Sequence, residues 1–142
     1  MPSLNIIRSA NAELLNGPPL VVVITGGTTG IGSYISHSIA TIFAENGSDL
    51  RVYIVGRNAS RAEGVMKDGV ETSPGSDWRF VKATDLALIS EVDRCSAEII
   101  CQETEAPFHG GPVRIDLLYM GHAYPILKER TSKWFISCSP SI

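Results

Sequence analysis

The sequence has no long hydrophobic run, no excess of basic residues and no N-terminal signal pattern. Its longest apolar stretch, around residues 20–24, is far too short to cross a bilayer, and residues 1–17 contain no continuous apolar segment of the kind that directs secretion. Twelve Lys and Arg against 15 Asp and Glu give a net charge of −3 without a basic cluster, which excludes a typical nucleic-acid-binding protein. We therefore expect a cytoplasmic protein with no membrane and no nucleic-acid partner.

Cysteine and histidine are also scarce, with three of each. The cysteines have no C-x-x-C spacing, which favours reduced thiols in a cytosolic protein over disulfides. The histidines are scattered, so the sequence predicts no metal site. These residues are Cys95, Cys101, Cys138, His37, His109 and His122.

Short apolar runs alternate with amphipathic segments along the chain. Strands are predicted over residues 21–24, 50–55, 78–83 and 113–120. Helices are predicted from residue 31 up to Gly47, which would end the first of them, and over residues 60–69 and 86–100. Apolar residues at positions 6, 7, 10 and 14 predict a further helix in a leading segment, residues 1–19, which ends in a Gly-Pro-Pro turn. The alternation is typical of βαβ crossovers, so the predicted fold class is α/β, a doubly wound parallel sheet of about four strands and three to four helices.

Local patterns predict the limits of two helices. Ser60 and Glu63 have the spacing of a capping box, which would open the helix that Gly69 closes. In the helix that begins at Leu86, positions 86, 89, 92, 96, 99 and 100 lie on one stripe. We expect this stripe to face the sheet.

A glycine-rich turn follows the first predicted strand, in the stretch LVVVITGGTTGIG. Its pattern, T-G-x-x-x-G-x-G, is formed by Thr25, Gly26, Gly30 and Gly32. Gly26 would allow the turn, Gly30 would let the backbone approach a pyrophosphate, and Gly32 would permit tight packing of helix on strand. Because the turn also opens an amphipathic helix, whose first amides attract phosphate, the sequence predicts a dinucleotide site. The alternative is a glycine-rich turn that binds no nucleotide.

The stretch TGGTTGIG, preceded by VVVI, resembles the cofactor signature of the short-chain dehydrogenase/reductase family. The likeness continues in YIVGRN, TDL and DLLYM, at or after the later strands, and it spans residues 8–132. The stretches RSANAEL, GPPLVVV and LKERTS resemble a fungal branch of the family that is common in secondary-metabolite pathways. The resemblance implies a partial Rossmann-like domain over residues 20–132, followed by a tail, residues 133–142, without likeness to the family.

The resemblance also implies which residues hold the cofactor. The pyrophosphate positions of the family fall on Gly26, Gly30, Ile31 and Gly32. The adenine-contacting pair falls on Asp85 and Leu86, where the Asp85 carboxylate would accept a hydrogen bond from the adenine. Asp85 is equally suited to cap the helix that follows, and one residue can do both.

The residues after the second strand favour NADPH over NADH. An NAD site uses a carboxylate at this strand end for the ribose 2′-hydroxyl, whereas an NADP site needs positive charge for the 2′-phosphate. The chain has Gly56, Arg57 and Asn58 there, and no acidic residue before Glu63. A guanidinium pairs strongly with a phosphate, and Thr28 in the glycine-rich turn would add a hydroxyl donor. The alternative for Arg57 is a solvated surface charge.

The catalytic set of the family is a Ser, a Tyr and a Lys four residues after the Tyr, whose charge lowers the Tyr pKa. Tyr124 and Lys128 have this spacing, but they follow the fourth strand directly, and Pro125 disfavours a helix at the tyrosine. We interpret the pair as a chance match, and His122 as a loop or core imidazole rather than a proton donor. Residues 120–123 also depart from the N-N-A-G of the family.

Related enzymes run to about 250 residues, so we expect this chain to be incomplete and to lack the Ser-Tyr-Lys set. The hypothesis is an oxidoreductase that uses NADPH for carbonyl or alcohol chemistry on a small molecule of secondary metabolism. The alternatives are a catalytically inactive NADP-binding remnant and a non-functional truncated product. The substrate and the oligomeric state stay open.

Overall fold

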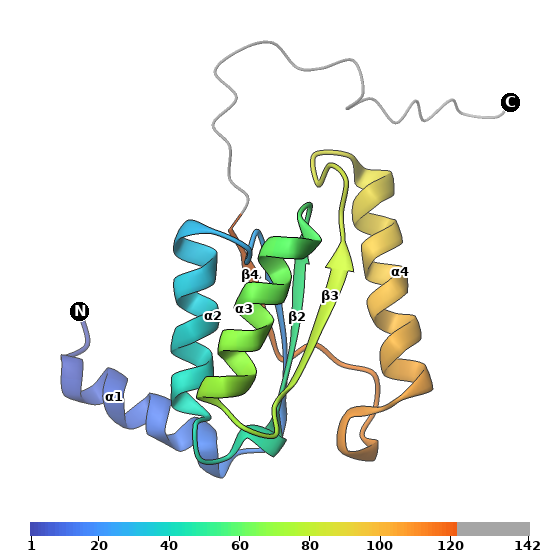
Figure 1. Ribbon diagram of the computed structural model, residues 1–142. Helices are drawn as coiled ribbons and strands as arrows, with labels where there is room; N and C mark the ends of the chain where they lie inside the picture. The colour runs from blue at the N-terminus through green and yellow to red at the C-terminus, as the bar shows by residue number, and fades with distance from the viewer. Residues whose placement is uncertain (122–142) are drawn as a thin grey trace, which may run out of the picture.

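The computed structural model describes residues 1–121, which form a parallel sheet flanked by helices (Figure 1). In this part of the chain the sheet has four strands in the order β3-β2-β1-β4, and all neighbours are parallel. The strands are β1 (Leu20–Thr25), β2 (Leu50–Gly56), β3 (Asp77–Lys82) and β4 (Leu117–Met120). The α-helices are α1 (Leu4–Glu13), α2 (Gly30–Ile42), α3 (Ala59–Thr72) and α4 (Ile89–Glu105). The predicted fold class is confirmed, but α2 ends at Ile42 and not at Gly47, which instead begins a short 3₁₀ turn, Gly47–Asp49.

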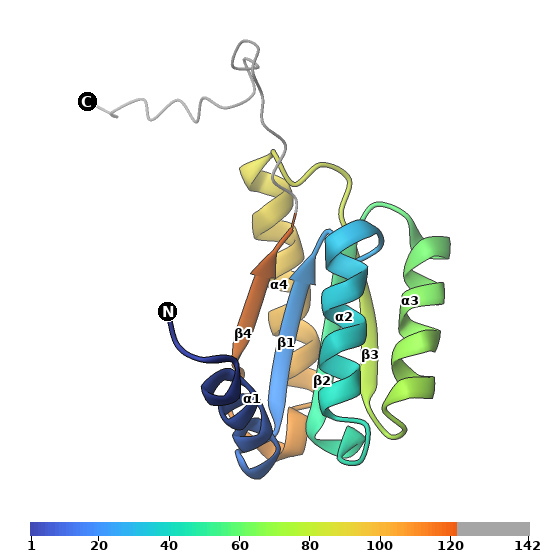
Figure 2. The same ribbon diagram turned by 90° about the vertical axis from the view of Figure 1, so that its left-hand side faces the viewer.

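The helices cover the two faces of the sheet unequally, with α2 and α3 on one face and α4 on the other (Figures 1 and 2). Side chains alternate between the two faces along a strand, so β1 contributes to both cores. Val22 and Ile24 pack in the core that holds residues of α2 and α3. Val21 and Val23 pack in the core that holds Cys95 and Ile99 of α4. Burial on both faces explains why β1 reads as a continuous apolar run.

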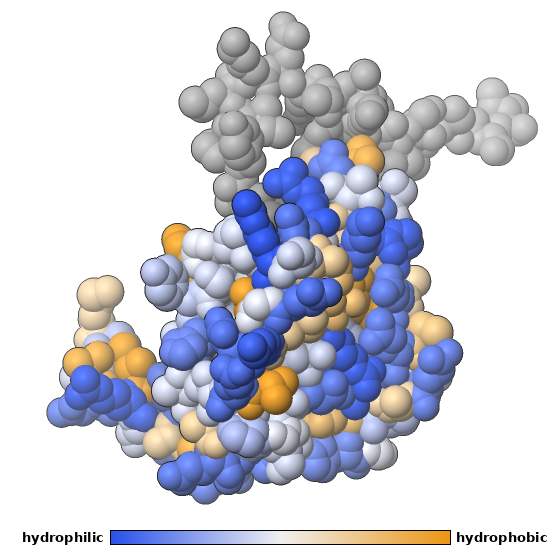
Figure 3. Space-filling model, viewed as in Figure 1, coloured by the Kyte–Doolittle hydropathy of each residue, from blue (hydrophilic) through white to orange (hydrophobic). Residues whose placement is uncertain are grey.

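The leading helix α1 and the edge strand β4 are the exposed elements of this fold. The helix expected in the leading segment is present, but none of its residues is buried, and its Leu4 and Ile6 side chains are about three-fifths exposed. Hydrophobic side chains accordingly gather over α1 at the lower left of Figure 3. Strand β4 pairs with β1 alone among the described strands, and its Leu118 and Met120 side chains are exposed.

The predicted capping box of α3 is wrong. The N-cap is Asn58, whose backbone is extended and whose side-chain oxygen accepts a hydrogen bond from the Arg61 amide at 3.0 Å. Ser60 therefore lies inside the helix. Gly69 does not end the helix either, because α3 continues to Thr72. Gly69 is glycine for a packing reason, since a Cβ there would meet the ring of Trp78.

The predicted start and inner face of α4 also need correction. The helix begins at Ile89 rather than at Leu86, because residues 85–88 form a separate turn in which the Leu88 amide donates to the Asp85 carbonyl. The buried side chains of the helix are Cys95, Ile99 and Glu103, whereas Ile89, Val92 and Ile100 of the predicted stripe are exposed. The face toward the sheet thus includes a carboxylate, which a search for apolar periodicity passes over.

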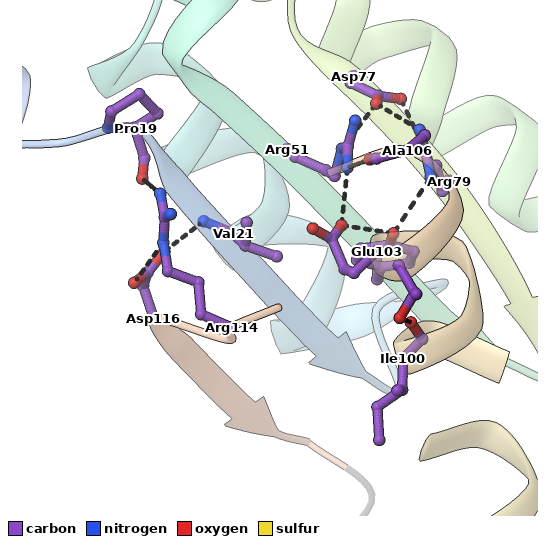
Figure 4. A network of polar contacts seen from close by, with 12 residues as sticks. Pro19, Val21, Arg51, Asp77, Arg79, Ile100, Glu103, Ala106, Arg114 and Asp116 are labelled. Carbon is purple, nitrogen blue, oxygen red and sulfur yellow. Dashed lines mark hydrogen bonds and ion pairs between the residues drawn. The ribbon is translucent and has the colours of Figure 1, made fainter. Parts of the chain in front are cut away.

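The fourth strand is shorter than predicted, since it begins at Leu117. The segment before it is nevertheless attached to β1. The Val21 amide donates to the Asp116 carboxylate at 2.8 Å, and the Asp116 amide donates to the Val21 carbonyl at 2.9 Å. Arg114 extends this connection to the Pro19 carbonyl at 2.6 Å (Figure 4).

A buried polar cluster closes the amino-terminal end of the sheet (Figure 4). Arg51, near the start of β2, donates to Asp77 of β3 and to Glu103 of α4, both at 2.8 Å. Tyr53 donates to the same Glu103 oxygen at 2.7 Å. Burial, with the hydrogen bond to Glu103, raises the pKa of Tyr53 to about 12. The centre of the Phe108 ring lies 4.6 Å from the Arg51 guanidinium carbon, within range of a cation–π contact.

Candidate functional site

The candidate site lies at the opposite, carboxyl-terminal end of the sheet, where parallel strands bring their ends together. Backbone hydrogen bonds hold the segments just beyond these ends. The Gly26 amide donates to the Val55 carbonyl at 2.9 Å, and the Ala83 amide donates to the Gly56 carbonyl at 2.9 Å. Loops that follow β1, β2 and β3 therefore share one edge of the sheet, the usual place for ligands in open α/β folds.

The glycine-rich turn between β1 and α2 has the backbone geometry that its sequence predicted. Gly26 and Gly30 have φ of +72° and +57°, values that favour glycine because they bring a Cβ into steric conflict. A Cβ on Gly32 would meet the Gly26 carbonyl oxygen, with the Gly26 carbonyl carbon and the Gly27 Cα both at 2.9 Å. The first turn of α2 is thus pressed onto the loop that leaves β1.

The first backbone amides of α2 are available to bind a ligand. Its N-cap, Thr29, has an extended backbone and makes no side-chain cap hydrogen bond. No atom lies within 4 Å of the place where a Cβ on Gly30 would stand, so the backbone there faces open space. The Ile31 side chain is 71% exposed, and only its backbone can contribute to a phosphate site at this turn.

Gly27 is a residue of the turn that sequence reasoning passed over. A Cβ at this position would lie 3.0 Å from Ile24 and 3.2 Å from Ile54, on two neighbouring strands. The loop therefore rests directly on the carboxyl ends of β1 and β2. The consecutive glycines of the turn were the available signal, because the first satisfies the positive φ and the second satisfies close packing.

Thr28 reaches from the glycine-rich turn to the end of the neighbouring strand. Its methyl carbon lies 3.0 Å, and its hydroxyl oxygen 3.6 Å, from the place where a Cβ on Gly56 would stand. The turn after β1 and the segment after β2 are thus in contact. The structure brings Thr28 beside Gly56, which directly precedes Arg57 and Asn58, the residues predicted to bind the 2′-phosphate.

Arg57 and Asn58 follow Gly56 and differ in what they do. The Arg57 side chain is exposed and has no hydrogen-bond or ion-pair partner among residues 1–121. The Asn58 side-chain oxygen is occupied, because it caps α3. Arg57 is therefore an available cation at this edge, whereas Asn58 has only its amide NH₂ to offer.

Asp85 and Leu86 follow β3 at the same edge. The Asp85 carboxylate is exposed and accepts a hydrogen bond from the Ala87 amide at 3.0 Å. It stabilises the turn before α4 and is not the N-cap of the helix, which is Leu88. Leu86 packs against the core beneath α4. One carboxylate oxygen of Asp85 stays free of the turn, so its predicted contact with adenine stays a prediction.

An ion pair fixes the loop that carries Asp85. Glu91 accepts a hydrogen bond from the Thr84 amide at 2.6 Å and pairs with Arg94 at 3.0 Å. The hydrogen bonds from Arg94 and Thr84 lower the pKa of Glu91 to about 2. Glu91 is therefore ionised at neutral pH and ties the loop to the first turns of α4.

The remaining predictions for this site concern catalysis, metals and membranes. Tyr124, Lys128 and His122 lie outside the described residues, as does the tail. Within residues 1–121, no group of three or more His, Cys, Asp or Glu side chains is arranged to hold a metal ion. Over the same residues, none of the helices combines the length and the apolar character needed to span a bilayer.

No family model matches the chain, but comparison with curated proteins gives several fungal relatives. The chain is 66% identical over 130 residues to the short-chain dehydrogenase/reductase SAT2 of Stachybotrys chartarum. The matched region covers 92% of this chain and 37% of that protein. It is 32% identical to the NmrA-like family domain-containing oxidoreductase notO of an Aspergillus species, over 92% of this chain and 36% of that protein. It is 33% identical to the oxidoreductase andH of Emericella variicolor, over 84% and 32%.

Among solved structures, a short chain dehydrogenase from Bacillus anthracis is 28% identical, with a TM-score of 0.48, over 74% of this chain and 35% of that one. The chain spans about a third of the length of the curated relatives it matches.

Proposed function

Because the chain is related to the short-chain dehydrogenases/reductases, we propose that residues 20–132 are the nucleotide-binding part of an oxidoreductase that uses NADPH. Its chemistry would be carbonyl or alcohol redox on a small molecule of fungal secondary metabolism. The observation that carries the proposal is the contact between the glycine-rich turn and the end of β2, which brings Thr28 beside Gly56. The free cation Arg57 directly follows.

The pyrophosphate would lie against the start of α2. Gly26 and Gly30 adopt positive φ, and Gly32 packs on Gly26, so backbone rather than side chains forms the surface of the turn. The Gly30, Ile31 and Gly32 amides and the positive end of the α2 dipole suit a diphosphate. The residues therefore fit the group that the glycine pattern predicts.

The 2′-phosphate would lie beside Arg57. A guanidinium without a protein partner can give its donors to a phosphate in a bidentate pair. Gly56 presents no carboxylate that would repel this phosphate, and the Thr28 hydroxyl and the Asn58 NH₂ are further donors at the same edge. Asp85 and the Leu86 backbone, in the next loop, would contact the adenine.

When bound, NADPH would supply the hydride, and the protein would have to supply the proton. A phenol needs a nearby cation to serve as an acid near neutral pH. Within residues 1–121, no tyrosine is followed by a lysine four residues later. Tyr124 and Lys128 lie outside these residues and are interpreted as a chance match, so we expect the chain to bind NADPH without turning over carbonyl compounds. A spectrophotometric assay of NADPH oxidation with a panel of carbonyl compounds would check this expectation.

Calorimetric titration of the full chain with NADPH and with NADH tests the proposal. NADPH should bind more tightly, and Arg57→Ala should weaken NADPH binding by about tenfold or more while leaving NADH binding unchanged, because only NADPH carries the 2′-phosphate. Arg61→Ala is the matched control, since Arg61 is an exposed arginine one turn along α3. No binding of either cofactor at millimolar concentration would overturn the proposal, and equal binding of both would overturn the preference for NADPH.

A further inference from the structure

The contact between Thr28 and Gly56 bears on cofactor choice in a way that charge alone does not. This inference rests on the proposed NADPH site and concerns why that site would reject NADH. Gly56 is the last residue of β2, the place where an NAD site presents a carboxylate to the ribose hydroxyls. Whether a side chain fits at this position is therefore a question of specificity.

At position 56, the limit on a side chain is the space around the residue and not its backbone conformation. It is buried at the strand end and is absent from the glycines of positive φ, which are Gly26, Gly30, Gly75 and Gly110 in the described chain. Any residue could adopt its backbone angles. The obstacle is Thr28, whose methyl carbon lies 3.0 Å from the Cβ position of residue 56, closer than van der Waals contact between carbons.

Thr28 has little freedom to retreat. Two residues before it, the Gly26 amide is bonded to the Val55 carbonyl at 2.9 Å. The residue immediately before it, Gly27, rests on Ile24 and Ile54 without room for a methyl group. The loop is thus held down on both strand ends, and Thr28 stays over Gly56.

We propose that the Thr28 methyl group is a specificity determinant, because it occupies the space that an NAD-type carboxylate side chain at position 56 would need. The Thr28–Gly56 pair favours NADPH over NADH in two ways. It keeps the strand end free of negative charge beside Arg57, and it fills the volume into which a carboxylate would have to turn toward the ribose.

The test is a set of variants of the full chain, titrated with NADPH and NADH. Gly56→Asp alone should weaken NADPH binding by about tenfold or more through charge repulsion and should gain little for NADH, because Thr28 obstructs the carboxylate. Adding Thr28→Ser removes the methyl and keeps the hydroxyl. The Thr28→Ser, Gly56→Asp double variant should bind NADH about tenfold or more tightly than Gly56→Asp.

Thr28→Val supplies the matched control, since it keeps the branched volume and loses the hydroxyl. The Thr28→Val, Gly56→Asp double variant should bind NADH no better than Gly56→Asp. Thermal unfolding of every variant separates loss of binding from loss of fold.

Three results would overturn the inference. In the first, Gly56→Asp alone binds NADH as tightly as its double variant with Thr28→Ser. In the second, the serine and valine double variants behave alike. In both cases the unchanged chain still prefers NADPH, so the proposed function stands. In the third, the unchanged chain binds neither cofactor, and then the proposed function fails first.

Discussion

Strand β2 carries an arginine near its start and another just past its end, and the two residues have opposite surroundings. Arg51 is 6% exposed and donates to Asp77, Glu103 and the Ala106 carbonyl. Arg57 is exposed and has no partner among the described residues. The same side chain thus stabilises the fold at one end of the sheet and is available for a ligand at the other.

The difference follows from the direction of the helices. At the amino-terminal end of the sheet, α4 finishes and presents carbonyl oxygens such as that of Ala106, which suit a cation. At the carboxyl-terminal end, α2 begins and presents amides, which suit an anion. A parallel α/β sheet therefore has one end that favours burial of its own arginine and one end that favours a phosphate.

Of the variants that test this difference between the two ends of the sheet, the removal of Glu103 should change the free energy of unfolding most. Glu103 is 1% exposed, and Glu103→Ala would leave Arg51 and Tyr53 buried without their shared acceptor. We expect the free energy of unfolding to fall by about 3–5 kcal/mol, measured by urea denaturation, with Glu103→Gln in between. NADPH binding per folded molecule should stay unchanged.

Glu105→Ala is the control for this prediction, because Glu105 is an exposed carboxylate two residues further along the same helix. It should change the free energy of unfolding by less than about 0.5 kcal/mol. Equal losses in the two alanine variants would show that the amino-terminal cluster does not stabilise the fold more than any surface charge.

Gly32→Ala tests the other end of the sheet. The new methyl would meet the Gly26 backbone, so α2 must move away from the turn at a cost of about 1–3 kcal/mol. Because the movement displaces the amides proposed to bind the pyrophosphate, NADPH affinity should fall together with stability. Calorimetry on the folded protein separates the two effects.

Gly64→Ala is the counterpart with space around it. Gly64 lies within α3, and no atom lies within 4 Å of its Cβ position. This variant should gain about 0.5–1 kcal/mol from helix propensity and keep its affinity for NADPH. An unchanged NADPH affinity in Gly32→Ala would contradict the role given to the turn.

The sequence was sufficient to predict features that depend on local patterns. The four strands, the glycine-rich turn and the relation to short-chain dehydrogenases/reductases are all confirmed, because continuous apolar runs and the T-G-x-x-x-G-x-G spacing carry them in neighbouring residues. The residues at which the helices begin and end could not be predicted as well. A capping box and Asn58 compete for the same helix start, and only the extended backbone of Asn58 decides between them.

Features that join distant residues could not be predicted in this way. Arg51 stands in the apolar stretch LRVYIV, and its partner Glu103 is 52 residues away. Thr28 meets Gly56 through two loops whose approach depends on the register of β1 and β2. In both cases the residue types alone do not indicate a role, because the role depends on a contact between residues that are distant in the sequence.

Glu91→Gln should give the smallest effect, visible as a dependence on pH. Glu91 lies at the carboxyl-terminal end, where it holds the loop of Asp85, and its pKa is lowered from 4.5 to about 2 in the folded chain by Arg94 and the Thr84 amide. Its charge therefore stabilises the fold above pH 4.5, and this stabilisation is lost as the pH falls toward 2.

Thermal unfolding at a series of pH values measures this effect. The melting temperature of the unchanged chain should exceed that of Glu91→Gln at neutral pH, and the two melting temperatures should converge in acid. Glu71→Gln, with Glu71 65% exposed, should stay close to the unchanged chain throughout. A gap for Glu91→Gln that persists at pH 2 would mean that its hydrogen-bond geometry, and not its charge, holds the loop.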